Sequence, residues 1–170
     1  NQKQKKIEVS IVNLSKIDLD FWQENSDEKT KISWNKISSQ LKKSDSFIIV
    51  SPEWHGMVPA KLKNFLLYCS KDELAHKPAL LVSVSAGLGG SYPIAELRIS
   101  SYKNNRLCYL PENVIIRNIE TFLNDKNKKK VKIIFDRLVE CLNLLIVYTE
   151  SFKLLREKIN FNFSLYPNGM

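Results

Sequence analysis

The chain has 170 residues, which is enough for one domain with a sizeable core and no need of disulfides. Its three cysteines, Cys69, Cys108 and Cys141, are far apart, and their spacing excludes a C-x-x-C redox or zinc motif. The net charge of +8 suits nucleic acid, an anionic membrane or a phosphorylated small molecule equally well. The densest basic run, residues 125–132, lacks the interleaved aromatic residues of a stacking platform, so we expect no nucleic-acid partner.

The expected location of the protein follows from its cysteines and its apolar runs. Free thiols favour a reducing compartment, and the amino-terminal residues do not form the apolar stretch of a secretory signal. The longest uncharged apolar-rich run, Cys141 to Thr149, is much shorter than the ~20 residues of a membrane-spanning helix. We therefore expect a cytoplasmic protein with no membrane partner.

The chain opens with a predicted strand and a predicted helix. Ile7, Val9 and Ile11 alternate with polar residues, which predicts a half-covered edge strand. A polar segment follows, and apolar residues at helical spacing then predict a helix. The apolar face of this helix is formed by Trp34, Ile37 and Leu41, and Asn25, Ser26 and Asp27 are available as caps.

Two strand–loop–helix units come next. Phe47 to Val50 is an all-apolar run rich in β-branched residues, which predicts a strand covered on both faces. It ends at Pro52, and Pro59 suits the first turn of a helix. A second buried strand is predicted at residues 79–84, followed by a glycine-rich loop and another helix. The apolar positions of the two helices are Leu62, Phe65, Leu66 and Cys69 in the first, and Ile94 and Leu97 in the second.

The last third predicts a further strand at Val114 to Ile116 and a long helix from Lys129 onward. Strands and helices thus alternate, which predicts an α/β fold with a parallel sheet and a single domain, residues 1–170. The tail, residues 161–166, alternates like a strand; it either packs on the surface, reaches a partner subunit or fills a gap in the sheet. The long helix is expected to bury Val131, Ile134, Phe135, Leu138, Val139 and Leu142.

The candidate site is formed by the loops that leave the first two buried strands. Parallel strands place their carboxyl ends at one edge of the sheet, where ligands bind in open α/β sheets, so we expect these loops to meet. The glycine spacing of the second loop is not G-x-G-x-x-G, and an ordinary turn is the alternative reading of that loop alone. The residues are Pro52, Glu53, Trp54, His55 and Gly56 in the first loop, and Ser85, Ala86, Gly87, Leu88, Gly89, Gly90 and Ser91 in the second.

These two segments resemble a known family. Residues 51–64, with the order S-P-E-W-H-G-M-V-P-A-K-L-K-N, and residues 77–91, followed by Glu96-Leu97-Arg98, are similar to the NADPH-dependent FMN reductases. That flavodoxin-like family includes azoreductases and quinone or chromate reductases. The resemblance implies a three-layer sandwich with strand order 2-1-3-4-5 and non-covalently bound FMN, with both loops contacting the isoalloxazine ring.

The resemblance also carries an expected reaction. NADPH or NADH would donate a hydride to bound FMN, and a small acceptor such as free flavin, a quinone or an azo compound would be reduced. A homodimer or homotetramer is implied. Because flavin performs the redox chemistry itself, no catalytic side chain and no metal ligand is expected. The alternatives are an electron-transfer module without nicotinamide turnover and a non-enzymatic member that has lost flavin.

The chain departs from the family pattern in three places. Trp54 stands where Tyr is usual, and it either packs on the flavin or fills a subunit contact. His55 stands where Asn is common, and it is either a hydrogen-bonding group for flavin or nicotinamide or a plain turn residue. The family's first strand, phosphate loop and first helix have no counterpart here. We expect these elements to precede Asn1, and a reduced family member is the alternative.

Other chemistries lack their motifs. The sequence contains no G-x-x-x-x-G-K-[ST] phosphate loop, no H-E-x-x-H metal helix and no G-x-S-x-G nucleophile elbow. Ser83 and Ser85 stand near glycines, but no partner histidine can be placed beside them. The sequence therefore gives no support to a metalloenzyme or a serine hydrolase.

Overall fold

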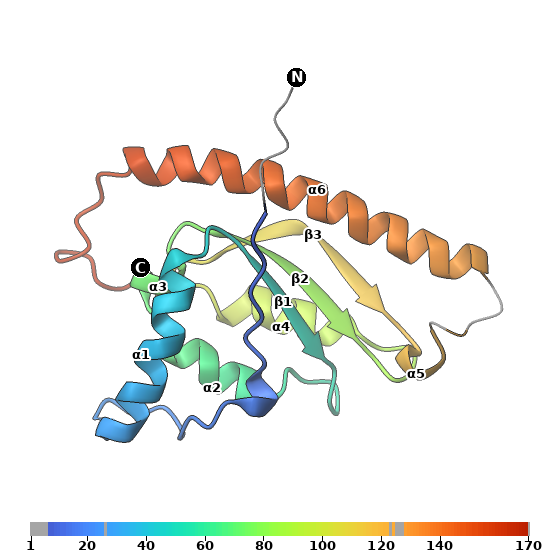
Figure 1. Ribbon diagram of the computed structural model, residues 1–170, viewed down its shortest axis with the longest axis horizontal. Coiled ribbons are helices and arrows are strands. Elements are labelled where there is room, and N and C mark those ends of the chain that lie inside the picture. Colours follow the sequence, from blue (N-terminus) through green and yellow to red (C-terminus); the bar gives the residue numbers. More distant parts are fainter. Residues whose placement is uncertain (1–6, 26, 123, 125–127, 170) are drawn as a thin grey trace.

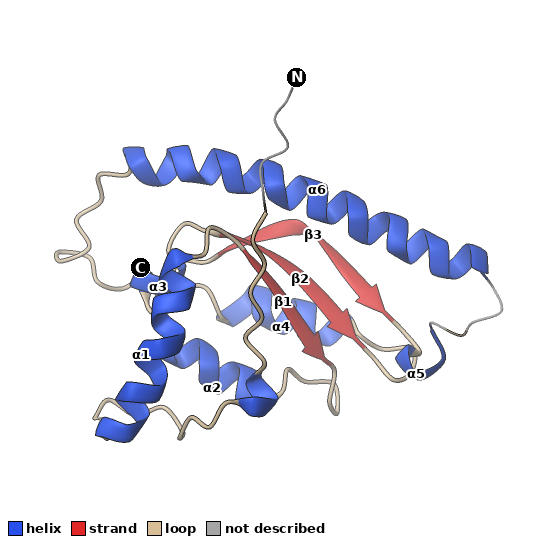
Figure 2. Cartoon of the chain, viewed as in Figure 1, coloured by secondary structure: helices blue, strands red, loops and turns tan. Residues whose placement is uncertain are grey.

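The fold is a parallel three-stranded sheet with helices on both faces (Figure 1, Figure 2). The computed structural model describes residues 7–25, 27–122, 124 and 128–169. The strands β1 (Phe47–Pro52), β2 (Pro78–Val84) and β3 (Cys108–Ile116) lie in the order β1-β2-β3, and both pairs are parallel. The predicted α/β class is confirmed. The three strands lie side by side in chain order, as strands 3, 4 and 5 do in the expected order 2-1-3-4-5. No described strand takes the place of strands 1 and 2.

One face of the sheet is covered by α1 (Glu28–Lys43), α2 (Ala60–Tyr68) and α4 (Ser91–Ser100). Asp27 caps α1 by accepting a hydrogen bond from the Thr30 N–H, and α2 starts directly after Pro59. Two short helices, α3 (Lys71–Leu74) and α5 (Ile119–Phe122), lie in the connections. The buried residues of this layer include Leu41, Leu62, Leu66, Ala79, Leu81, Ile94 and Leu97.

The other face is covered by one long helix, α6 (Lys128–Lys158). It packs Cys141 and Leu145 against β2 and β3, and Ile134, Leu138 and Leu142 line the same contact. The predicted face is therefore partly right, but Phe135 is exposed and Val139 is 53% exposed. The stripe that faces the sheet runs through positions 134, 138, 141 and 145, which turns positions 135 and 139 toward its flank.

The sheet is not covered evenly, which corrects one expectation. Ile48 and Val50 are 47% and 58% exposed, so β1 is not buried on both faces. In the β1–β2 register they lie beside Leu80 and Val82, which α6 covers. The helix reaches β2 and β3, and no described element covers this face of β1.

Both ends of the chain also differ from the prediction. Residues 7–13 form no strand, and Ile7, Val9 and Ile11 are exposed, because no described strand lies beside them to exchange hydrogen bonds. A short 3₁₀ helix, η1 (Leu14–Lys16), follows. The tail at 161–166 is a turn rather than a strand, and it packs on the surface against Arg106, whose guanidinium lies over the Phe161 and Phe163 rings.

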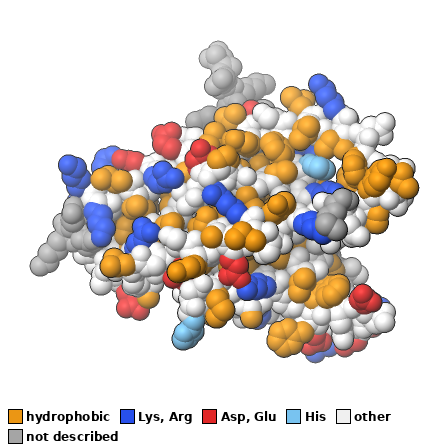
Figure 3. All heavy atoms as spheres, turned by 180° about the vertical axis from the view of Figure 1, so that it is seen from behind, with side chains coloured by type: hydrophobic (Ala, Val, Ile, Leu, Met, Phe, Trp, Pro, Cys, Tyr) orange, Lys and Arg blue, Asp and Glu red, His pale blue; other side chains and the backbone are white. Residues whose placement is uncertain are grey.

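The basic residues are spread over the surface. Residues 125–127 of the basic run lie outside the described residues, and the run continues as the exposed first turn of α6. On the face drawn in Figure 3, Lys and Arg side chains are scattered among hydrophobic and neutral ones. In the described part of the chain, no helix has the length and apolar character needed to cross a bilayer.

Candidate functional site

The first loop is a tight turn that projects beyond β1. The Trp54 N–H donates to the Met57 carbonyl at 3.1 Å, and the Met57 N–H donates back to the Trp54 carbonyl at 2.9 Å. His55 and Gly56 form the apex with φ of +50° and +73°, and positive φ at both central residues is the signature of a type I′ turn. The turn leaves the Trp54 side chain 62% exposed.

The second loop runs from β2 into α4. The buried Ser85 donates its N–H to the Ile116 carbonyl at 2.9 Å, and Gly87 accepts from the Asn118 N–H at 3.0 Å. Ala86 and Gly87 are exposed, Leu88 is 80% exposed, and a Cβ on Gly87 would meet open space. The middle of the loop therefore presents its backbone to solvent.

Glu53 joins the two loops. Its N–H donates to the Val84 carbonyl at 2.8 Å, and its Oε2 accepts from the Gly90 N–H at 2.7 Å. Its carboxylate also occupies the space where a Cβ on Gly89 would lie. On the other flank, a Cβ on Gly56 would lie 3.8 Å from the Tyr92 ring. The loops predicted from the strand pattern thus meet at one edge of the sheet.

An exposed apolar rim surrounds this junction. Two of its side chains come from the first turn, one from the glycine-rich loop and one from the first turn of α4. Large exposed apolar side chains that gather in one place are typical of binding surfaces, so this rim makes the edge a candidate site. The rim residues are Trp54, Met57, Leu88 and Tyr92.

Sequence reasoning missed two supports of the site. Arg117 directly follows β3, and its Nε donates to the carbonyls of Leu88 and Gly89 at 2.7 and 2.8 Å. The rule that placed the other loops could have found it, because β3 ends at the same edge. Glu96 of α4 accepts from the Val58 N–H at 2.7 Å, and its ion pair with Lys63 and then this hydrogen bond lower the pKa of the Glu96 carboxyl.

Residues 1–121 match the NADPH-dependent FMN reductase family. The chain belongs to this family. An NADPH azoreductase of Bacillus sp. (strain OY1-2) is 25% identical over 115 residues, which are 68% of this chain and 65% of that protein. An FMN-dependent NADPH-azoreductase of Staphylococcus saprophyticus is 31% identical over 75 residues, 44% of this chain and 40% of that protein. The chain thus spans less than two thirds of the length of these relatives.

A solved structure supports the fold. An oxidoreductase from Corynebacterium diphtheriae superposes with a TM-score of 0.58 at 16% identity, covering 69% of this chain and 62% of that one. At this identity the likeness concerns the fold alone. Together with the family match it confirms the flavodoxin-like class.

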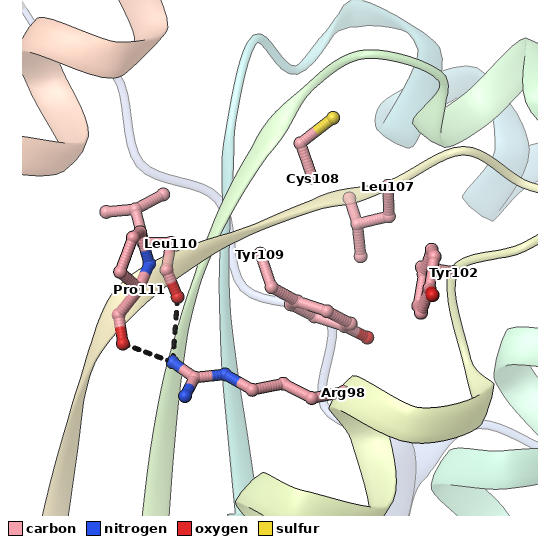
Figure 4. Close-up of a pocket in the computed structure, with 7 residues that line it drawn as sticks. All are labelled: Arg98, Tyr102, Leu107, Cys108, Tyr109, Leu110 and Pro111. Atoms are coloured by element: carbon pink, nitrogen blue, oxygen red, sulfur yellow. Dashed lines mark hydrogen bonds between the residues drawn. The ribbon is translucent and has the colours of Figure 1, made fainter.

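The two loops form an exposed shelf at this edge of the sheet. A hollow of about 460 Å³ lies elsewhere, between α4 and the outer edge of β3 (Figure 4). There Arg98 donates to the carbonyls of Leu110 and Pro111 at 2.8 and 2.5 Å, and no predicted site residue lines this hollow. β1 is the outermost strand of the described sheet, so no described strand flanks the shelf on that side.

Proposed function

We propose that this chain is the part of an NAD(P)H-dependent flavin reductase that holds the isoalloxazine ring of FMN. The observation that carries the proposal is the Glu53 contact with Gly90, which brings the turn after β1 and the loop after β2 together at the carboxyl edge. That edge is where open α/β sheets bind ligands. Family membership and the names of the relatives support FMN and NADPH as the molecules involved.

The residues at this edge fit a flat ring. Gly87 has no Cβ and faces open space, so a planar ligand can approach the backbone of the loop closely. The exposed indole of Trp54 offers an aromatic surface beside it. When bound, FMN supplies the redox chemistry by accepting a hydride from a nicotinamide and reducing an acceptor.

The protein's own part is to bind and to orient. Trp54 and Leu88 supply apolar contact and displace water from the ring. His55 is exposed at the apex of the turn, and its imidazole can donate a hydrogen bond to, or accept one from, polar atoms of flavin or nicotinamide. The net charge of +8 draws in the anionic phosphates of NADPH from a distance. The proposed acceptor is a small molecule such as free flavin, a quinone or an azo compound.

We also propose that a second copy of the chain covers the rim of Trp54, Met57, Leu88 and Tyr92 in a homodimer or homotetramer. The support is the exposure of these four side chains around one site. Sedimentation velocity of the native chain against a Leu88→Glu variant tests it, because a charge at the rim should dissociate the oligomer.

A flavin-binding module without nicotinamide turnover is the second candidate. The exposure of the two loops favours it, because a site open to solvent gives a nicotinamide few surfaces against which to stack. The non-enzymatic alternative requires that the shelf take up no flavin at all.

Anaerobic addition of NADPH to the FMN-loaded chain separates these functions. We expect the visible absorbance of bound flavin to bleach and to return when a quinone is added. Flavin that stays oxidised would reject the reductase and leave the binding module, and failure to take up FMN would reject both. Trp54→Ala should weaken FMN binding about tenfold, on the scale of aromatic contacts, whereas Trp22→Ala, an exposed tryptophan elsewhere, should not.

A further inference from the structure

The glycine-rich loop is held from two sides by opposite charges. On the β1 side, the Glu53 carboxylate accepts a hydrogen bond from the Gly90 N–H at 2.7 Å. On the β3 side, the Arg117 Nε donates to the carbonyls of Leu88 and Gly89. Contacts in which one partner is ionised are stronger than those between neutral groups. The three strand ends are therefore tied together through the backbone of the central loop.

Glu53 is itself fixed by the sheet. Its N–H donates to the Val84 carbonyl, and this hydrogen bond extends the pairing of β1 with β2 by one residue beyond Pro52. The side chain is half-buried, and its carboxylate fills the space beside Gly89. Any residue other than glycine at position 89 would therefore require the Glu53 carboxylate to move. Gly89 thus leaves the space that the Glu53 carboxylate occupies.

The carboxylate also completes the start of α4. Gly90 is the N-cap residue, has no side chain to satisfy the first turn, and adopts a φ of +102°. A negative charge is favourable at a helix N-terminus, where unpaired N–H groups point outward. Glu53, from a different strand, supplies that charge and one of the missing acceptors.

We propose that Glu53 is a positioning residue for the cofactor loop, with Arg117 as its counterpart on the opposite side. Glu53 does not touch the ring through its carboxylate; it sets the height and tilt of the Gly87 to Gly89 backbone against which the ring lies. This inference rests on the proposed function, because it takes the loop to border the flavin. It gives the Glu53 side chain a role in holding the loop, where the family resemblance implies only that both loops contact the ring.

The test uses the full chain in four variants: Glu53→Ala, Glu53→Gln, Gly89→Ala and the double variant Glu53→Ala/Gly89→Ala. Glu157→Ala, an exposed glutamate near the end of α6, is the matched control. Two quantities are measured: the dissociation constant of FMN by quenching of its fluorescence, and hydrogen exchange of the Gly90 amide in the flavin-free protein. Thermal unfolding of the flavin-free variants separates a change at the loop from a loss of the fold.

We expect Glu53→Ala to speed Gly90 exchange and to weaken FMN binding by about tenfold each, as for the loss of one hydrogen bond to a charged group. Glu53→Gln, which keeps an acceptor without the charge, should fall between Glu53→Ala and the native chain. Gly89→Ala should weaken FMN binding because its Cβ meets the carboxylate. The double variant should bind FMN no worse than Glu53→Ala, since the added methyl group enters the vacated space.

Additive losses in the double variant would overturn the inference, because two merely destabilising changes would add. A Gly90 amide that exchanges in Glu53→Ala at the same rate as in the native chain would overturn the inference, whatever the result of the flavin titration. If the native chain takes up no FMN, the proposed function and the cofactor role of Glu53 both fail. In that outcome the exchange measurement still decides whether Glu53 holds the loop.

Discussion

At the scale of single residues, the site is determined by which positions lack a Cβ. Gly56 adopts the positive φ of the first turn, and Gly89 leaves room for the Glu53 carboxylate. Gly90 adopts a positive φ at the start of α4, where a Cβ would meet the Ile115 side chain. The sequence was sufficient to place these glycines in two loops at one edge, because each loop follows a predicted strand and parallel strands have their carboxyl ends at the same edge. It could not pair Glu53 with Gly90, since that contact depends on the register of β1 against β2 and on one side-chain rotamer.

Replacing Gly90 by alanine should be costly. The new Cβ would meet the Ile115 side chain, and a φ of +102° is strained for any residue with a side chain. We expect a loss of about 1–3 kcal/mol in the free energy of unfolding, measured by urea denaturation. Gly87→Ala is the matched control because its Cβ meets open space, and equal stability of the two variants would contradict the assignment.

Lys77 makes a pH-dependent contribution to stability. Its ammonium is buried and donates to the carbonyls of Leu41 and Lys42 at 2.9 and 3.1 Å, and burial, then the nearby Arg156, lowers its pKa from 10.5 to about 8. Between pH 8 and 10.5 the unfolded chain therefore binds more protons at this position than the native chain does. Native stability accordingly gains from this lysine as the pH rises through that window.

Lys77→Met removes that gain. We expect the difference in unfolding free energy between the native chain and this variant to move in favour of the native chain from pH 8 to pH 10. Lys61→Met, at an exposed position of α2, should leave the pH dependence unchanged. Parallel pH curves for the native chain and Lys77→Met would show that the ammonium titrates as it does in water.

At the scale of elements, the internal strands and helices were predictable and the chain ends were not. β1, β2, α2 and α4 follow from short apolar runs bounded by proline or glycine, because those signals are local. Residues 7–13 and 161–166 carry the alternation of strands but form none, since alternation creates a strand only where a neighbouring strand supplies hydrogen bonds. The burial of β1 was overestimated for a related reason: composition does not reveal how far α6 extends across the sheet.

The buried face of α6 can be tested with two substitutions on the same helix. Leu145 packs against β2 and β3, and its replacement by alanine should cost about 2–5 kcal/mol of unfolding free energy, as for other buried leucines. Val139→Ala, on the exposed flank, should change stability by less than about 0.5 kcal/mol. A larger loss for Val139→Ala than for Leu145→Ala in denaturant titrations would mean that the helix is rotated.

At the scale of the whole molecule, the arrangement places every proposed ligand contact at one end of the sheet. The carboxyl ends of β1, β2 and β3 lead to Glu53, the glycine-rich loop and Arg117, while the tail packs against Arg106, which precedes β3. The hollow beside β3 is separate from this edge and is lined by none of its residues. Binding at the shelf and binding at that hollow are therefore distinguishable by location.

The most direct test is to map FMN onto the chain by backbone amide NMR. As FMN is added to the ¹⁵N-labelled chain, we expect saturable shift changes at residues 53–57 and 86–91, with the largest at Gly87, Leu88 and Gly89. Amides of the hollow beside β3, such as Tyr102 and Leu110, should hardly move. Shift changes confined to that hollow or to the tail, with both loops unaffected, would contradict a flavin shelf built from the two loops.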